Sequence, residues 1–193
     1  RYPAKRAMYV AVAALLLSDN PVISVNGNAT ALAIDEIIEL ARAIDAKIEI
    51  NLFYRNDERV KLLTTLYRDH GYKEILGSLD DDIEYLNDIK NNRASASKTG
   101  IYSADTILIP LEDGDRAEIL KKSGKNIITI DLNPLSRTSK MSDVSIMDNI
   151  VRAIPFMTKI AEDLQTQDKQ VLIEMVNDFD NEENLKESIK QIK

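Results

Sequence analysis

The stretch "PVISVNGNATALAIDEIIELARAI", residues 21–44, contains the pattern that decides the fold. It opens with the β-branched run "PVISV", passes through the polar turn "NGNAT", and continues as "ALAIDEIIELARAI", whose apolar residues recur every three or four positions. A short β-branched run bounded by turn residues is typical of a strand, and a period near 3.6 is typical of an amphipathic helix. The stretch therefore predicts a strand, a turn and a helix.

The same unit recurs along the chain. Three more copies follow in outline: "KIEINLFYR" (47–55) with "NDERVKLLTTLYRDHG" (56–71), "TILIPLEDGD" (106–115) with "RAEILKKSG" (116–124), and "NIITIDLNPLSRTS" (126–139), which runs into a long loop. A further strand, "DVSIMDN" (143–149), precedes a helix over 150–165. Such alternation is typical of a parallel sheet with helices on both faces, so we expect an α/β fold in a single domain spanning 1–193.

Three other segments complete the predicted organisation. Residues 4–18 carry apolar side chains on nearly all sides, which predicts a helix at or near a subunit interface. Residues 168–193 predict two C-terminal amphipathic helices interrupted around "NDFDNEEN". We expect 77–99 to be an insertion or flexible loop with one helical turn, mobile over 91–99 because "NNRASASKT" has no apolar anchor.

Composition limits the classes of partner. The 25 Lys and Arg residues against 32 Asp and Glu give a net charge of -7, the wrong sign for a protein that binds nucleic acid or anionic membranes. The most apolar stretch, "MYVAVAALLL", has about half the length that a membrane span requires. Without cysteine there is neither a disulfide framework nor a thiolate metal site, which suits a cytoplasmic protein with small-molecule or protein partners.

Polar side chains gather where the predicted strands end. In an open parallel sheet, ligands bind beyond the carboxyl ends of the strands, where helix N-termini present free N–H groups. Five polar segments occupy these positions: "VNGNAT", "NLFYRND", "PLEDGDR", "DLNPLSRTS" and "MDN". Their number exceeds what structural turns require, so we expect binding sites at this edge, with "DLNPLSRTS" delivered to the switch-point crevice.

Two of these segments allow alternatives. Gly27 lies between Asn26 and Asn28, which suits the approach of backbone amides to a phosphate or carboxylate, and equally a tight turn whose residues tolerate positive φ. It lacks the glycine spacing of the dinucleotide fingerprint and of the P-loop. The segment "EDGDR" (112–116) could hold Mg²⁺ through one or two carboxylates, or could be an Asp-capped helix start with the arginine paired to a neighbour.

Single residues carry less information about function than these segments do. Arg137, between hydroxyls in "SRT", suits bidentate contact to a phosphate, and Arg55 is a reasonable anion anchor. His70, the only histidine, precedes a glycine at a predicted helix C-terminus, where a cation is favoured in any case. With no Cys–His pair and no convincing Ser–His–Asp set, covalent nucleophilic catalysis is not expected.

Taken together, "PVISVNGNATAL", "INLFYRNDER", "GIYSADTILIPLEDGDR", "IDLNPLSRTS" and "DNIVRAIP" closely resemble the archaeal 4-phosphopantoate--beta-alanine ligase family, also called phosphopantothenate synthetase. The similarity runs in order from about residue 6 to 192. The resemblance implies a Rossmann-like core, a homodimer, and a ligase of coenzyme A biosynthesis that uses ATP and releases AMP and diphosphate through an acyl-adenylate. The alternative is a non-catalytic nucleotide-sensing domain with a Rossmann-like pocket.

The resemblance also implies site residues. The ATP contacts carried over are Asp131, Leu132, Asn133, Arg137, Thr138, Asn149 and Ile150, with Arg137 and Asn133 taken as catalytic. The residues assigned to the 4-phosphopantoate side are Asn26, Gly27, Asn28 and Arg55. Glu112, Asp113 and Asp115 are assigned to Mg²⁺ or to the β-alanine ammonium. The family carries a further N-terminal segment with basic ATP ligands, so we expect those ligands to lie outside the present sequence.

Overall fold

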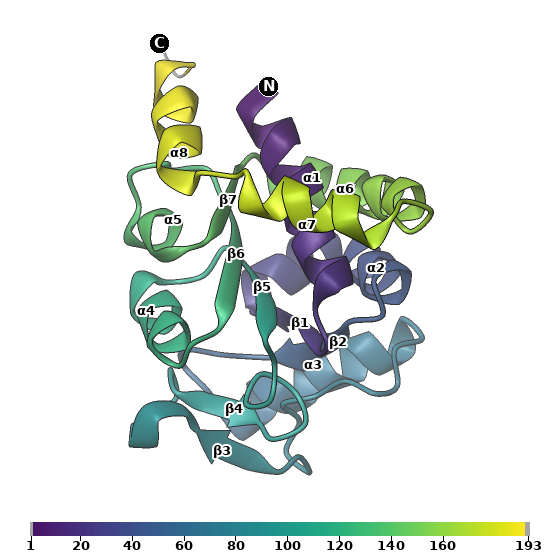
Figure 1. Ribbon diagram of the computed structural model, residues 1–193. Coiled ribbons are helices and arrows are strands. Elements are labelled where there is room, and N and C mark those ends of the chain that lie inside the picture. Colours follow the sequence, from purple (N-terminus) through teal and green to yellow (C-terminus); the bar gives the residue numbers. More distant parts are fainter. Residues whose placement is uncertain (1, 192–193) are drawn as a thin grey trace.

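The computed structural model describes residues 2–191, whose centre is a five-stranded sheet in the order β2-β1-β5-β6-β7 (Figure 1). All four strand pairs are parallel, as predicted. The strands are β1 (Pro21–Val25), β2 (Lys47–Ile50), β5 (Thr106–Pro110), β6 (Asn126–Asp131) and β7 (Val144–Met147). Each is almost entirely buried, because a parallel sheet is covered on both faces and its strands need no polar side.

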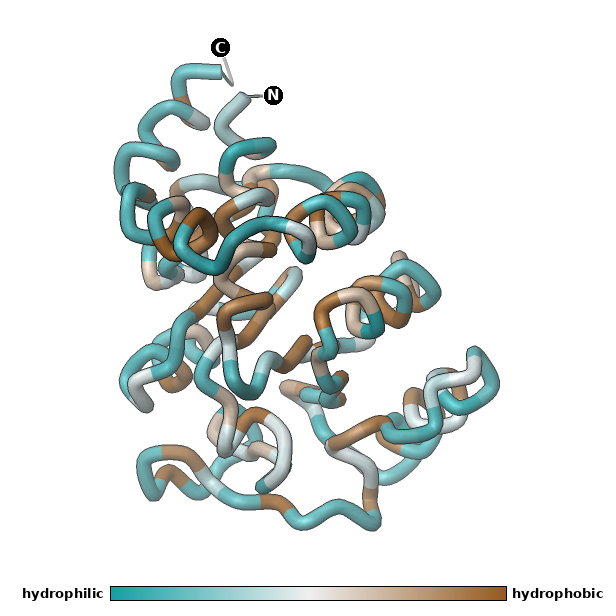
Figure 2. Tube along the Cα trace, turned by 45° about the vertical axis from the view of Figure 1, so that its right-hand side comes forward, coloured by the Kyte–Doolittle hydropathy of each residue, from teal (hydrophilic) through white to brown (hydrophobic). Residues whose placement is uncertain are grey.

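Alternate strand residues enter two separate cores. Ile23 and Leu108 belong to the larger core, whereas their neighbours Val22 and Ile107 belong to the smaller one on the other face. The larger core includes residues of α1 (Tyr2–Leu17), α2 (Gly27–Ala43), α3 (Asp57–Asp69) and α6 (Ile150–Leu164), and the smaller one is covered by α4 (Gly114–Lys122) and α5 (Arg137–Met141). Apolar segments accordingly concentrate at the centre of the tube in Figure 2. The expected α/β fold with helices on both faces is confirmed.

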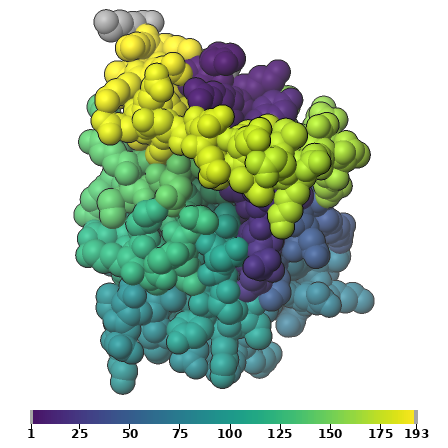
Figure 3. All heavy atoms as spheres, viewed as in Figure 1, coloured from purple at the N-terminus to yellow at the C-terminus, as the bar shows by residue number. Residues whose placement is uncertain are grey.

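Helix α1 is covered within the chain itself. Buried side chains lie on all its faces, among them Ala7, Val10, Val12 and Leu15. The helix packs against α6, α7 (Lys169–Asn177), α8 (Asn181–Lys190) and β7, and α7 lies across it in Figure 3. The C-terminal helices therefore cover the apolar faces of this helix, so the expectation that the chain's own core cannot cover them is wrong. A subunit interface near this helix stays a prediction. The two predicted C-terminal helices are confirmed.

The segment 77–99 differs from the expectation of an unanchored loop. It forms a small antiparallel sheet of β3 (Ile83–Tyr85) and β4 (Ser95–Ser97), with the expected helical turn at η1 (Leu86–Asp88) between them. Ala94 and Ala96 are buried in the smaller core, so the prediction that 91–99 has no apolar anchor is wrong for 94–97. Alanine side chains are small enough to pack closely under the sheet, which the polar composition concealed.

His70 has the predicted capping role. It is the C-cap of α3, and Gly71 follows with φ +83°. Its Nδ1 lies 2.6 Å from Asp35 Oδ1 on α2. The histidine therefore joins α3 to α2.

At the amino ends of the strands, Asp105 binds the residues that lead into β1. Its carboxylate accepts hydrogen bonds from Ser18 Oγ and from the N–H groups of Asp19 and Asn20. Burial raises the pKa of this carboxyl, but those hydrogen bonds outweigh it and leave the pKa below its ordinary value. The charged form is thus the one that the fold stabilises.

We expect Asp105→Asn to lower the free energy of unfolding by about 1 kcal/mol near pH 7, allowing for solvent screening of this exposed group. Because the folded pKa is depressed, the stabilisation exists above the unfolded pKa and is lost as pH falls through the folded value. Urea unfolding from about pH 7 down to about pH 3 should therefore show the two proteins converging. A difference that stays constant with pH would contradict this origin.

Candidate functional site

The polar loops meet at the carboxyl edge of the sheet. The chain proceeds from β1 to β2 on one side and from β5 to β6 and β7 on the other, so the switch point lies between β1 and β5. The loops flanking it are 26–28 and 111–113. The loop after β6, expected at the switch point itself, lies one strand further along the same edge.

Asn26 joins the two sides of the switch point. Its Oδ1 accepts a hydrogen bond from Ala29 N at 2.9 Å and caps α2, and its Nδ2 donates to Leu111 O at 2.9 Å. Gly27 is the first residue of α2 and has no positive φ, so the alternative of a positive-φ turn is wrong. A Cβ at Gly27 would meet nothing closer than Arg59 Nη2 at 3.9 Å, and Asn28 is exposed. The helix N-terminus is therefore open to solvent.

The loop after β6 is organised by its own side chains. Asp131 accepts hydrogen bonds from Asn133 N and from the hydroxyls of Ser136 and Ser139. Asn133 Oδ1 in turn accepts from Leu135 N at 2.9 Å. Of the predicted ATP residues here, Asp131 and Asn133 therefore shape the loop.

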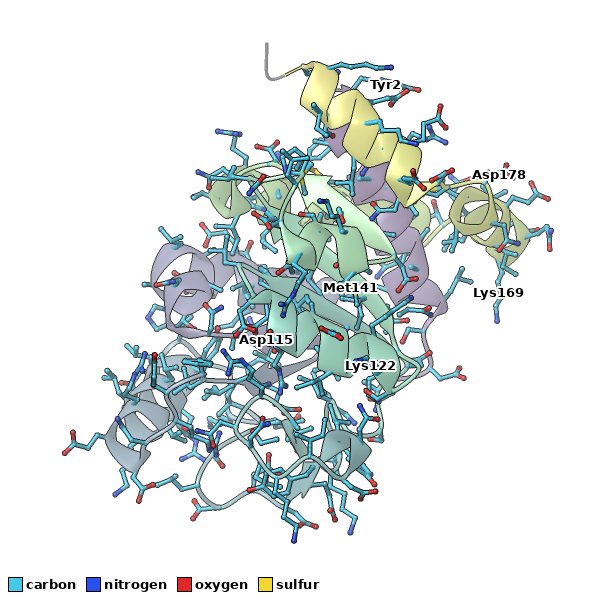
Figure 4. All side chains as sticks on the ribbon, turned by 90° about the vertical axis from the view of Figure 1, so that its left-hand side faces the viewer. Tyr2, Asp115, Lys122, Met141, Lys169 and Asp178 are labelled. Atoms are coloured by element: carbon cyan, nitrogen blue, oxygen red, sulfur yellow. The ribbon has the colours of Figure 1, made fainter. Side chains whose placement is uncertain are left out.

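Arg137 and Thr138 begin α5, a short helix where the sequence predicted a loop. Thr138 is buried, and its Oγ1 donates to Glu112 O at 2.9 Å. Arg137 is exposed and pairs with Asp115, and Glu118 lies 4.0 Å away. A hydrogen bond from Arg137 holds the pKa of Asp115 below its usual range, and the same contact raises that of Arg137. Figure 4 shows Asp115 at the start of α4, with Met141 of α5 above it.

The loop after β7 borders a cavity. Asn149 caps α6 by accepting a hydrogen bond from Val151 N at 3.0 Å, and Ile150 is buried. Beside it lies a cavity of about 330 Å³ lined by Pro3, Ala4, Leu132, Met147, Asp148, Arg152, Ser188 and Gln191. The ends of β6 and β7 thus border a cavity that residues of α1, α6 and α8 also line. Leu132, largely exposed, is the predicted ATP residue that lines it.

Arg55 is turned away from the switch point. Its Nη2 donates to Gly77 O at 2.9 Å and to Ser78 O at 3.4 Å, which holds the start of the 77–99 segment. Gly77 has φ +75°, and a Cβ there would overlap the carbonyl of Ile50. Arg55 therefore satisfies backbone carbonyls in this structure rather than forming an open anion anchor.

The three predicted metal ligands are separated in role. Asp113 caps α4 by accepting from Arg116 N at 2.9 Å, as the second alternative for this segment proposed. Asp115 pairs with the arginines Arg93 and Arg137. Glu112 is half-buried, and burial raises its pKa although the positive charge of Arg116 acts to lower it. Within residues 2–191, no group of three or more Asp, Glu, His or Cys side chains is arranged to hold a metal ion. Asp113 and Asp115 are engaged by the N-terminus of α4 and by arginine side chains, so neither carboxylate is free for Mg²⁺ in this structure.

A buried polar network lies beneath the site, and sequence reasoning missed most of it. Glu49 on β2 accepts hydrogen bonds from Ser97 N at 2.9 Å, Ile101 N at 2.6 Å and Asn51 Nδ2 at 3.2 Å. Burial raises the pKa of Glu49 in spite of those contacts. The available signal was a carboxylate between the two isoleucines of the strand "KIEI".

Arg116 completes this network from the other side. Its Nη2 donates to Asn51 Oδ1 at 2.7 Å and its Nη1 to Ser95 O at 2.9 Å. The segment was expected to pair this arginine with a neighbour, but its hydrogen-bond partners are an amide oxygen and a backbone carbonyl from the loop after β2 and from β4. A small cavity above it is lined by Asn51, Leu52, Phe53, Asn92, Arg93, Glu112, Asp113 and Arg116.

Comparison with known proteins identifies the family of this chain. The family described as phosphopantothenate/pantothenate synthetase matches residues 3–193. The chain belongs to this family. It is 46% identical over 192 residues to a 4-phosphopantoate--beta-alanine ligase of Thermococcus onnurineus (strain NA1), covering 99% of this chain and 73% of that protein. It is 48% identical over 182 residues to the Methanosarcina mazei protein of the same name, covering 94% and 71%.

The synthetase fold also has a solved counterpart. A chain from a structural study of the mechanism and regulation of Sir2 enzymes superposes with a TM-score of 0.51 at 11% identity, covering 81% of this chain and 98% of that one. This likeness concerns the fold alone and supports the Rossmann-like architecture. Among residues 2–191, no helix is long and apolar enough to cross a membrane.

Proposed function

We propose that the chain is an ATP-dependent ligase that condenses 4-phosphopantoate with β-alanine to 4'-phosphopantothenate in coenzyme A biosynthesis, releasing AMP and diphosphate. The observation that carries this proposal is the family match over residues 3–193, together with relatives of that name at 44–48% identity. The polar loops at one edge of the sheet provide the space and the charges for more than one substrate. We place the reaction in the cytoplasm, in a homodimer.

The chemistry explains why charged loops are needed. Joining a carboxylate to an amine in water is uphill, so the carboxylate must first be activated. Release of AMP implies that the carboxylate of 4-phosphopantoate attacks the α-phosphate of ATP, forming an acyl-adenylate and expelling diphosphate. The amine then attacks the acyl carbon and AMP leaves. The protein has to hold two anions together and neutralise the charge that develops.

Each side of the edge has a proposed role. Arg137 neutralises phosphate charge, and the loop held by Asp131 and Asn133 positions the nucleotide beside the cavity that Leu132 lines. Asn149 and Ile150 present the N-terminus of α6 to the same nucleotide. Thr138 reaches ATP through its backbone, because its hydroxyl donates to Glu112 O.

For the second substrate we propose the open N-terminus of α2. The N–H groups of Gly27 and Asn28 suit an anion, and Asn26 acts by capping the helix. Arg55 contributes only by holding the neighbouring segment. Glu112 remains the candidate for the β-alanine ammonium, because it is half-buried at the switch point. Any Mg²⁺ that accompanies ATP needs ligands other than Asp113 and Asp115 as they are paired here.

The test supplies ATP with 4-phosphopantoate, with β-alanine, or with both, and measures AMP and diphosphate. A ligase forms AMP in quantity only when both substrates are present. A nucleotide-sensing domain, the competing function, would bind ATP without forming either product, and that result would refute the proposal. Diphosphate exchange into ATP that requires 4-phosphopantoate but not β-alanine would isolate the adenylation step.

A further inference from the structure

Two arginines from different elements meet at one carboxylate. Arg93, next to β4, places its Nη2 3.3 Å from Asp115 Oδ2, while Arg137 of α5 pairs with the other oxygen, Oδ1. Two guanidinium groups repel each other unless an anion lies between them. Asp115 supplies that anion. The two arginines therefore converge on a space that a single anionic group can occupy.

Arg93 is oriented for this role by its surroundings. Its guanidinium lies 3.8 Å from the ring centroid of Phe53, and its Nε lies 3.4 Å from Asp113 Oδ1. The main chain at this position is held as well, because the backbone N–H of Arg93 donates to Asn91 Oδ1 at 2.9 Å. The side chain is 32% exposed, against 56% for Arg137, so it retains less freedom to lose on binding a ligand.

The convergence point lies against the start of α4. A Cβ at Gly114 would come within 2.7 Å of Arg137 Nε, so only glycine leaves room for this arginine to cross the helix N-terminus. The point where the two arginines meet lies between the loop after β2, which supplies Phe53, and α5, which supplies Arg137. It therefore lies between the proposed site of the second substrate and the proposed site of the nucleotide.

We propose that Arg93 is a phosphate-binding residue that acts together with Arg137 on one phosphate group, and that Asp115 occupies the pair of arginines until this phosphate replaces it. The inference rests on the proposed ligase function. A phosphate group carries more charge than a carboxylate and accepts bidentate contacts from both guanidinium groups, so it can displace Asp115. The phosphate belongs either to ATP or to 4-phosphopantoate, and the experiment distinguishes the two.

The experiment compares Arg93→Ala, Arg93→Lys and Asp115→Asn with a control, Lys98→Ala. Lys98 lies in the same segment, and its exposed ammonium pairs with Asp82 at 3.5 Å, away from the site. The KM of each substrate is measured in 4-phosphopantoate-dependent exchange of diphosphate into ATP, and the affinity for each is measured by calorimetry. Thermal unfolding of every variant reports on the fold.

We expect Arg93→Ala to raise the KM of one substrate by about 10- to 100-fold and to weaken its binding equally, with Arg93→Lys restoring part of the loss. Asp115→Asn should lower the same KM severalfold, because the competing carboxylate is gone. A change confined to ATP assigns the phosphate to ATP, and a change confined to 4-phosphopantoate assigns it to that substrate. Lys98→Ala should stay within about twofold of the parent protein.

Three results would overturn the proposal. The first is an Arg93→Ala variant whose affinities stay within twofold of the control. The second is an equal loss of affinity for both substrates, which would indicate a general loosening of the segment. The third is an Asp115→Asn variant that binds the phosphate-bearing substrate more weakly than the parent protein does. If the parent protein shows no exchange, the proposed ligase function fails. The calorimetric affinities for the two ligands still decide the role of Arg93, and Asp115→Asn does so even if Arg93→Ala does not fold.

Discussion

Arg137→Ala is expected to slow adenylate formation by roughly 30- to 1,000-fold while leaving the free energy of unfolding nearly unchanged. A charge-assisted contact that strengthens as phosphate charge develops contributes on the order of 2 to 4 kcal/mol to the transition state, which gives this range. The fold loses little, because Arg137 is 56% exposed and its partner Asp115 is 51% exposed. Exposed ion pairs contribute little to stability.

The measurement is the rate of diphosphate exchange into ATP in the presence of 4-phosphopantoate, with urea unfolding alongside. Arg137→Lys should recover only part of the rate, because an ammonium keeps the charge without the planar fork. Gly114→Ala provides a second comparison, since its methyl group displaces the Arg137 side chain without removing it. A variant that unfolds while its folded fraction retains ATP affinity would make Arg137 structural and our assignment of this loop wrong.

The strands and long helices could be predicted because local pattern determined them. The β-branched run and the 3.6-residue period in 21–44, and the Asn and Asp residues that cap α2 and α4, act over a few residues. Topology then placed the polar loops at one edge. The covering of α1 by α7 and α8 could not be predicted, because it depends on contacts between residues more than 150 positions apart.

The partners of the arginines at the site also could not be predicted, because they too depend on contacts between distant parts of the chain. Arg55 and Arg116 look alike in sequence as arginines near strand ends, yet one holds the carbonyls of Gly77 and Ser78 and the other is buried under the site. The 77–99 segment packs against both arginines, and its position determines which arginine side chains are occupied by its backbone carbonyls. The alanines that anchor that segment carry almost no sequence signal, so the partners of Arg93 and Arg116 emerged only in three dimensions.

The second large effect concerns stability, and its site is Arg116. This side chain is 3% exposed, donates to Asn51 Oδ1 and Ser95 O, and lies in the field of the Glu49 and Glu112 carboxylates. We expect Arg116→Ala to lower the free energy of unfolding by about 3–5 kcal/mol, because removing one member of a buried charged network leaves the others uncompensated. The exposed Arg68→Ala on α3 is the matched control and should change stability by less than about 0.5 kcal/mol.

The pH dependence of this loss identifies its cause. Burial already raises the pKa of Glu49 and of Glu112, and Arg116 opposes that rise, so its removal raises both pKa values further. A carboxyl whose folded pKa is raised contributes stability below its unfolded pKa, which is about 4.5, and loses it as pH rises through the folded value. The destabilisation by Arg116→Ala should therefore grow from about pH 5 to about pH 8 in urea unfolding. A loss of the same size at both values would mean that Arg116 stabilises the fold through packing and hydrogen bonds, without a contribution from its charge.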